Sequence, residues 1–261
     1  MTDMRNGTLL QHDRQEAIYV LALRHGTVDV ADLAARYGVT TETIRRDLSD
    51  MQLRGLLRRV HGGAVPADRM GHEPMVDARD MVNAEEKLRI ARQAIAEVPE
   101  RGSVIIDSGS TGQRLAHVFP VERDVHVVTN SLVTAVTLSR RGLRELSVLG
   151  GTVRTNTLAM VDDSGRSELA HMAIDVLFIS CDGLSFHHGL TTPYRVEQTL
   201  KRAMIVRADR VVAMVDGSKF GNVQMFSFAV FEEIDVLVTD TRVDDAAVEA
   251  LTDHGVAVHR V

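Results

Sequence analysis

A short segment of the chain concentrates side chains that can bind nucleic acid. Between Thr43 and Gly63 there are five arginines and two aspartates, although the whole chain carries a net charge of −6. Guanidinium groups bind phosphates and guanine edges, and hydroxyl groups bond to both phosphates and bases. The local positive charge therefore predicts a surface for double-stranded DNA. The expected contact residues are Thr41, Thr43, Arg45, Arg46, Ser49, Arg58, Arg59 and His61.

A second group of polar residues follows a series of apolar segments. The first example is VIIDSGSTGQ (104–113), in which small residues precede an expected helix. Such a loop lets backbone N–H groups approach an anion, and the helix N-terminus adds partial positive charge. An ordinary turn capped by Ser or Thr gives the same pattern, and no Gly-Lys-Ser/Thr of a P-loop follows. Similar polar ends occur at Thr129–Asn130–Ser131, Gly150–Gly151, Asp182–Gly183 and VDGSKFG (215–221).

Catalytic and metal-binding chemistry have weaker support in the sequence. Asp182 and Glu197 could act as a general base toward a sugar phosphate, with Lys219 stabilising an enediolate oxygen. That reading describes an isomerase-like enzyme with an appended DNA-binding domain, and we keep it as the alternative. No His, Cys or Asp set has the spacing of a structural zinc site. The sequence therefore predicts no catalytic residue, no metal and no cofactor.

The basic segment requires two short helices and a hairpin to position it. Asp29 can cap a helix over 30–37, which Gly38 ends, and Thr40 or Thr41 can cap a second helix. In that second helix Ile44, Leu48, Met51 or Gln52, and Leu56 follow the spacing of one buried stripe. The alternating residues from 56 to 61 and the glycine pair 62–63 indicate a two-stranded wing. A solvated basic helix in another small bundle is the alternative, but a winged helix-turn-helix suits the major groove.

The polar strand ends require a sheet whose strands finish at one edge. Apolar strands are expected at 104–107, 125–129, 146–149, 176–180, 211–215, 236–239 and 256–259. Helices are expected between them at 113–118, 132–140, 165–172, 194–208 and 244–254, after a helix at 85–98. Alternation of strand and helix predicts a Rossmann-like, mostly parallel α/β sheet covered on both faces. Ligands of such sheets bind at the carboxyl ends of the strands.

The composition of the chain excludes several other classes of protein. A hydrophobic content of 44% and a charged content of 25% are typical of a globular protein. No run of about 20 apolar residues is present, and the first residues lack a signal-peptide core, so we expect no membrane segment. The single cysteine, Cys181, lies in an apolar run, where a small buried core residue is expected. One cysteine suits a reducing compartment, and the sequence predicts a cytoplasmic protein.

The string TTETIRRDLSDMQLRGLLRRVHGGA (40–64) closely resembles the DNA-binding signature of the DeoR family of bacterial transcription regulators. DSGST, VTNS, the glycine pair, the DG after the fourth strand, GLTTP and DGSKFG resemble the sensor domain of the same family. That domain is similar to ribose-5-phosphate isomerase and recognises phosphorylated sugars or related metabolites. The resemblance implies that the effector contacts are Asp107, Gly109, Ser110, Thr111, Gly112, Asn130, Ser131, Gly151, Asp182 and Lys219. One departure is MVDDSGRSEL (160–169), whose Asp162 and Asp163 either reject a second negative charge or cap a helix.

These observations predict a DNA-binding transcription regulator, with the resemblance implying a repressor of a carbohydrate operon that a sugar phosphate modulates. The expected domains are a winged helix-turn-helix at 1–62, a linker at 63–75 and a sensor at 76–261. One DNA-binding domain offers too few contacts for operator affinity, so we expect a homo-oligomer, either a dimer or a tetramer. The expected partners are operator DNA and a small-molecule effector.

Overall fold

The chain forms two units. The computed structural model describes residues 10–66 and 76–261, and its contacts separate Met1–Val82 from Asn83–Val261. Residues 67–75 of the predicted linker, and residues 1–9 of the predicted DNA-binding domain, lie outside the described residues. The division falls after Val82, so the first unit includes the helix Val76–Met81, with which the sequence begins the predicted sensor.

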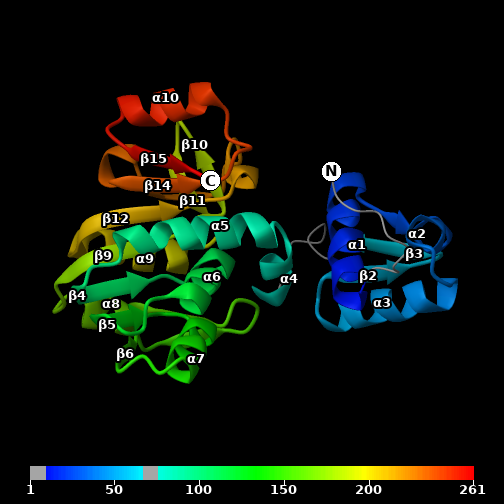
Figure 1. The fold of residues 1–261 in the computed structure, drawn as a ribbon, viewed down its shortest axis with the longest axis horizontal. Helices are drawn as coiled ribbons and strands as arrows, with labels where there is room; N and C mark the ends of the chain where they lie inside the picture. The colour runs from blue at the N-terminus through cyan, green and yellow to red at the C-terminus, as the bar shows by residue number, and fades with distance from the viewer. Residues whose placement is uncertain (1–9, 67–75) are drawn as a thin grey trace. The chain divides into compact units, whose positions relative to one another are not determined.

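The described part of the first unit is a winged helix-turn-helix (Figure 1, blue to cyan). Asp29 caps the second helix, because its carboxylate accepts the backbone N–H of Ala31 at 2.7 Å. Gly38 ends that helix with φ 63°, a left-handed conformation that glycine adopts at little cost. Thr40, the first of the two predicted caps, accepts the N–H of Thr43 at 3.1 Å. The elements are α1 (Gln11–His25), β1 (Val28–Asp29), α2 (Val30–Tyr37), α3 (Thr41–Leu53), β2 (Leu57–Val60), β3 (Gly63–Pro66) and α4 (Val76–Met81).

The buried stripe predicted for α3 is confirmed. Ile44, Leu48, Met51 and Leu56 are fully buried, together with Ile18 of α1. Ile44, Leu48 and Met51 recur every three or four residues, so they lie on one side of α3, whereas Leu56, predicted as part of the same stripe, is buried in the turn after the helix ends at Leu53. Burial of this side fixes which residues of α3 remain at the surface.

The wing is larger than predicted. Strands β2 and β3 pair through the turn at His61–Gly62, and β1 adds to β3 to give a three-stranded antiparallel sheet. Because β3 continues to Pro66, the hairpin passes residue 62, where the sequence placed the end of the first domain. Strand β1 has two residues, too few for an alternating pattern to predict.

The close approach of β1 explains the second glycine of the wing. A Cβ on residue 63 would lie 1.9 Å from the carbonyl oxygen of Val28, which is backbone and cannot rotate away. Gly63→Ala should therefore lower the free energy of unfolding of the first unit by roughly 2 kcal/mol, the usual scale of overpacking. Gly62→Asn is the matched control, since asparagine tolerates the left-handed conformation at φ 78°. Equal denaturation midpoints for the two variants would contradict this account.

The second unit contains a seven-stranded parallel sheet in the order β15-β14-β12-β9-β4-β5-β6, and all seven strands match predicted ones. The chain leaves β4 toward one edge and resumes at β9 on the other side of β4. This reversal is the topological switch point, next to which open α/β sheets bind ligands. The strands are β4 (Arg101–Ile106), β5 (Asp124–Thr129), β6 (Glu145–Val148), β9 (Ile174–Ile179), β12 (Ala208–Met214), β14 (Val236–Thr239) and β15 (Ala257–Arg260).

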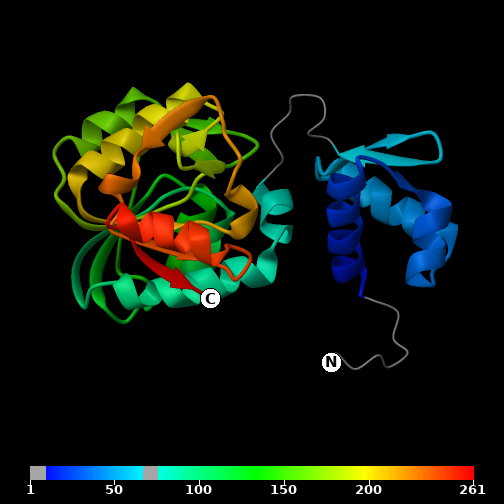
Figure 2. The ribbon, with the colours of Figure 1, turned by 90° about the horizontal axis from the view of Figure 1, so that it is seen from above.

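Helices cover both faces of this sheet, as predicted. Along β4, Val104 and Ile106 belong to the core cluster that contains residues of helices α5, α6 and α7, whereas Ile105 belongs to the cluster that contains residues of α8, α9 and α10. Figure 2 shows α5 (teal) and α9 (yellow) on opposite sides of the sheet. The helices are α5 (Ala84–Ala94), α6 (Ser110–Val118), α7 (Leu132–Arg140), α8 (Asp163–Leu169), α9 (Arg195–Arg207) and α10 (Asp245–Asp253). Among the described helices, none has the length and apolar character needed to cross a bilayer.

Short antiparallel strands supplement the main sheet and were not predicted. Strands β7 (Thr152–Arg154) and β8 (Ala159–Val161) form a hairpin, and β10 (Gly183–Ser185), β11 (Gly189–Thr192) and β13 (Phe226–Ala229) form a small sheet. Short 3-10 turns lie at Ile95–Glu97, Gly217–Lys219 and Phe231–Glu233. The hairpin β7–β8 follows the glycine pair 150–151, and it supplies a residue to the site described below.

Candidate DNA-binding surface and effector site

The exposed side of α3 carries the predicted DNA-contacting residues. Arg45 and Arg46 are exposed, and both lie 3.8 Å from the carboxylate of Glu42, one turn earlier. Thr41 is exposed, whereas the half-buried Thr43 hydroxyl lies 2.9 Å from that of Thr40 in the helix cap. Since exposed ion pairs contribute little, both arginines can leave Glu42 for a phosphate or a base edge.

The wing is attached to α3 by side chains. The backbone N–H of Arg59 donates to Gln52 at 3.0 Å, and the Arg59 guanidinium donates to the Ser49 hydroxyl at 3.1 Å. Ser49 in turn donates to the carbonyl of Arg45. Arg58, Arg59 and His61 are exposed on the wing. The predicted contact residues thus lie on two connected elements of the first unit.

Two charged residues counted toward the basic segment have structural roles instead. Asp47 is buried and accepts a hydrogen bond of 2.6 Å from Arg14, which joins α1 to α3. Arg54 donates to Gln15 at 3.1 Å. The charge facing solvent is therefore carried by Arg45, Arg46, Arg58 and Arg59. The only sign of the Arg14–Asp47 pair in the sequence is a charged residue next to the buried stripe.

The predicted anion loop lies at the carboxyl end of β4. Gly109 has φ 141°, and a Cβ there would lie 2.8 Å from the Ser180 hydroxyl after β9. Gly112 approaches the Asp107 carbonyl so closely that a Cβ would lie 2.5 Å away. Ser110 and Thr111 begin α6, so the loop ends at a helix N-terminus. The tight backbone and the helix end suit an oxyanion.

Asn130 and Ser131 hold the neighbouring loops in place. The Asn130 carbonyl accepts the N–H of Ser108 at 2.9 Å, and its amide donates to the carbonyl of Met160 at 3.4 Å. Ser131 caps α7 through the N–H of Thr134. Both predicted effector residues therefore have protein partners, and Asn130 connects the anion loop to β8.

A buried ion pair that the sequence did not reveal lies at the switch point. Lys201 of α9 donates to the Asp107 carboxylate, and it also donates to the Ser180 carbonyl at 2.9 Å. The side chains are almost inaccessible, with Asp107 2% and Lys201 5% exposed. Burial opposes the charge of Lys201, but the carboxylates of Asp107, Glu197 and Asp182 hold the pKa of the ammonium above its usual value. The lysine therefore stays protonated beside the anion loop.

More carboxylates gather on the same side of α9. The Thr192 hydroxyl lies 2.7 Å from Glu197 and 3.2 Å from Asp182. Glu197 also accepts a hydrogen bond from Arg154 of the hairpin β7–β8. Glu197, Leu200, Lys201 and Met204 are buried and recur with helical spacing on one side of α9. Two charged residues within this otherwise apolar stripe were the sequence signal that could have indicated a buried ion pair.

Lys219 and Gly151, both predicted effector residues, lie in other surroundings. Lys219 lies in the 3-10 turn after β12, and its charge helps to hold the pKa of Asp216 below its usual value despite burial. The turn is next to the strand after Asp182, because Gly221 donates to the carbonyl of Leu184 at 2.8 Å. Gly151 has φ 140°, and a Cβ there would lie 2.9 Å from Asp162.

The two unusual residues Asp162 and Cys181 have simple explanations. Asp162 caps α8 by accepting the N–H of Ser164 at 2.8 Å, the main reason its pKa is lowered. This confirms the capping interpretation of Asp162.

Cys181 is buried as predicted, and desolvation raises the pKa of its thiol to about 12. A thiol that stays protonated is a poor nucleophile.

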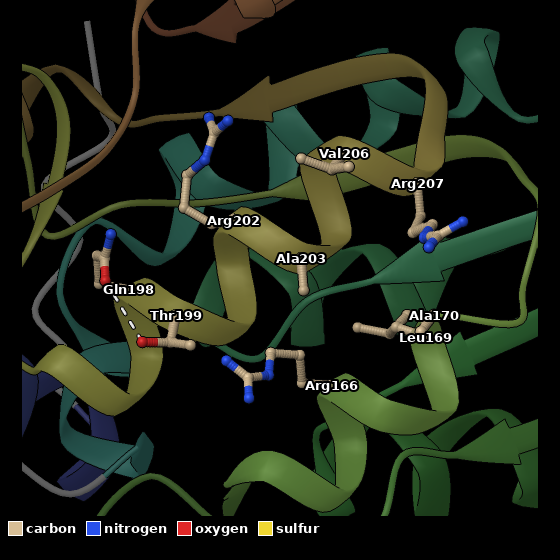
Figure 3. Close-up of a pocket in the computed structure, with 9 residues that line it drawn as sticks. All are labelled: Arg166, Leu169, Ala170, Gln198, Thr199, Arg202, Ala203, Val206 and Arg207. Carbon is tan, nitrogen blue, oxygen red and sulfur yellow. Dashed lines mark hydrogen bonds between the residues drawn. The ribbon is translucent and has the colours of Figure 1, made fainter.

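A groove of about 370 Å³ lies between α8 and α9 (Figure 3). Its lining includes the apolar residues Leu169, Ala170 and Ala203 and the arginines 166, 202 and 207. Arg202 is bound by Glu233 at 2.7 Å, and Arg166 lies 3.0 Å from Asp163. None of the lining residues belongs to the predicted effector set, so this groove is separate from the residues at the switch point.

The buried pair at the switch point makes a stability prediction. Lys201→Met removes the cation and leaves Asp107 buried without it, which typically costs about 3–5 kcal/mol. We expect a lower urea midpoint for the second unit. The fluorescence of a label attached to that unit measures this midpoint. Adding Asp107→Asn should recover part of the loss, because it removes the unpaired charge. A wild-type midpoint for Lys201→Met would show that the pair contributes nothing to folding.

The fold and these surfaces define a class of protein: a winged helix-turn-helix joined to a parallel α/β domain with a glycine-containing loop at its switch point. Residues 14–69 match the DeoR-like helix-turn-helix domain, and residues 82–241 match the DeoR C-terminal sensor domain. The chain therefore belongs to the DeoR family and is a DNA-binding transcription regulator.

Named relatives agree with this assignment over nearly the whole chain. The HTH-type transcriptional regulator GlpR of Haloferax volcanii is 34% identical over 96% of this chain and 98% of its own length. The glycerol-3-phosphate regulon repressor of Escherichia coli K12 is 29% identical over 94% of this chain and 96% of its own length. Because these proteins are regulators, the alternative of a sugar-phosphate isomerase is not favoured.

A solved structure is also distantly similar to part of this chain. Ribose 5-phosphate isomerase A of Methanocaldococcus jannaschii superposes with a TM-score of 0.40 and 17% identity, covering 53% of this chain and 55% of that chain.

Proposed function

We propose that this regulator represses an operon of carbohydrate metabolism and that a phosphorylated sugar modulates its hold on the operator. The regulon name of the Escherichia coli relative, which refers to glycerol 3-phosphate, supports the effector class. The observation that carries the proposal is the pairing of an exposed basic α3 with an anion loop at a switch point. The hairpin to Pro66 extends the DNA-binding domain that we propose, and residues from Asn83 onward form the sensor.

The proposed DNA contacts are those of α3 and the wing. Arg45 and Arg46 lie on the exposed side of α3, where they can enter the major groove. Arg58, Arg59 and His61 can then contact the neighbouring backbone. A homo-oligomer would place two such domains on a symmetric operator, since one domain buries too little surface for operator affinity. Light scattering during size-exclusion chromatography measures whether it is a dimer or a tetramer.

The proposed effector site uses the loop after β4 for the phosphate. Backbone N–H groups at 109–112 and the N-terminus of α6 stabilise the oxyanion. Lys201, protonated and buried beside the loop, adds charge, and Asp182 can accept a hydroxyl of the sugar. Binding at this site would favour one of two states of the oligomer, and the DNA affinity changes only by the effector's different affinity for those states.

A thermal-shift screen combined with an operator gel shift tests the proposal. The compounds are ribose 5-phosphate, fructose 1-phosphate, fructose 6-phosphate and glycerol 3-phosphate, each beside its unphosphorylated counterpart. We expect at least one phosphorylated compound to raise the unfolding temperature and to alter operator binding, and its counterpart to do neither. Stabilisation by the unphosphorylated compounds alone would place recognition outside the anion loop.

A further inference from the structure

The hairpin β7–β8 spans the two sides of the switch point. On one side, β8 is attached to the loop after β5: Leu132 donates to Leu158 at 3.0 Å and Met160 donates to Asn130 at 2.7 Å. Asn130 also holds Ser108, at the start of the anion loop. On the other side, the last residue of β7 is Arg154, which contacts α9. The hairpin is thus connected to both walls of the proposed effector site.

Arg154 is held by two residues at the start of α9. Its guanidinium donates to the Glu197 carboxylate and lies over the ring of Tyr194, 3.9 Å from the centroid. The side chain of Arg154 is 16% exposed and that of Glu197 is 8% exposed. The turn after Arg154 is tight, because its carbonyl accepts N–H groups from both Thr157 and Leu158. Leu158 has φ 53°, unusual for a residue with a branched side chain.

The partner of Arg154 is itself in a crowded negative environment. Glu197 shares the Thr192 hydroxyl with Asp182, and both carboxylates lie near the Asp107–Lys201 pair. A guanidinium binds a carboxylate or a phosphate with the same planar donors, so a phosphorylated ligand offers Arg154 an equivalent partner of higher charge. Glu197 and such a ligand would compete for one cation.

We propose that Arg154 is a further effector-binding residue, which exchanges Glu197 for the phosphate of the bound effector and carries the hairpin β7–β8 with it. This inference rests on the proposed function of the site. Glu197 acts as a competitor in this scheme, and its removal therefore favours binding. If Glu197 contacted the sugar directly, its removal would weaken binding. The direction of the change in affinity therefore distinguishes the two roles.

The test is a double-mutant cycle on the full chain by titration calorimetry. Glu197→Gln should bind the phosphorylated compounds of the screen, and inorganic phosphate, more tightly than wild type. Arg154→Gln should bind them roughly tenfold or more weakly, the range of one charge-assisted hydrogen bond. Glu197→Gln should raise affinity less in the Arg154→Gln chain than in the wild-type chain, because part of its effect is the release of Arg154 and part is the loss of a negative charge near Lys201. Arg140→Gln, an exposed arginine at the end of α7, is the control and should change affinity less than twofold.

Hydrogen exchange of residues 152–161 provides a readout that does not depend on affinity. In Glu197→Gln without added compound, these amides should exchange faster than in wild type, while those of the central strands stay unchanged. Weaker binding by Glu197→Gln, or a gain from Glu197→Gln that is as large in the Arg154→Gln chain as in the wild type, would overturn the inference. A wild-type chain that binds none of the compounds would instead overturn the proposed function, and the inference with it.

Discussion

Arg45→Ala combined with Arg46→Ala should weaken operator binding by at least about thirtyfold, since each arginine that contacts a base or a phosphate contributes roughly 1–3 kcal/mol. Both side chains lie on the exposed side of α3, opposite a stripe that is fully buried. Their loss leaves the core and the cap at Thr40 unchanged. The effect should therefore appear in DNA binding and not in the unfolding temperature.

Salt dependence separates the two kinds of contact that these arginines can make. A phosphate contact contributes about −0.9 to the slope of log affinity against log salt concentration, whereas a base contact changes the preference among operator sequences. Gel shifts at several salt concentrations, on operator and on random duplex, measure both. Arg140→Ala, with an arginine exposed on the second unit, controls for the change in net charge. Unchanged operator affinity in the double variant would refute the assignment of α3 as the recognition helix.

Ser110→Asp should abolish the response to a phosphorylated sugar while leaving operator binding intact. The new carboxylate would stand at the start of α6, where the helix dipole favours it and where it would repel a phosphate. The asparagine of Ser110→Asn has nearly the same shape as the aspartate of Ser110→Asp but carries no charge, so this variant should keep most of the response. The comparison therefore isolates charge from the loss of space at a buried position.

The measurement is operator release in a gel shift with increasing concentrations of the phosphorylated compound that stabilises the wild type. Ser110→Asp should remain on the operator at concentrations that release both the wild type and Ser110→Asn. A wild-type response from Ser110→Asp would move the phosphate site to another part of the sensor. Loss of the response in both variants would indicate that the position tolerates no larger side chain.

The sequence allowed the main sheet to be predicted because each of its strands is a run of Val, Ile and Leu bounded by polar residues. Helix α3 was equally clear, since a cap, a buried stripe and a glycine all agree on its position. The strands β7, β8, β10 and β11 were missed because three or four residues show no period. Such short strands form only because the surrounding fold supplies their partners.

The candidate site was harder to predict than the fold. Residues that follow strands, such as Asp107 and Ser110, could be named because parallel strands end at one edge. Lys201 and Arg154 could not, because a lysine on a helix and an arginine in a hairpin usually face solvent. Their roles depend on the order of the strands, which places α9 beside the end of β4, and no local pattern encodes that order.

The pairing of β4 with β9 has a consequence for how the protein is made. Val104 pairs with Val176, and Ser103 bonds to Asp175 across 72 positions of sequence. The nascent chain therefore exposes one side of β4 until the ribosome has added β9, whereas the contacts of the first unit are complete by Val82. We expect translation that stops between these points to release a chain that has its basic recognition helix but lacks the complete sheet of the second unit. Such a fragment could not respond to an effector.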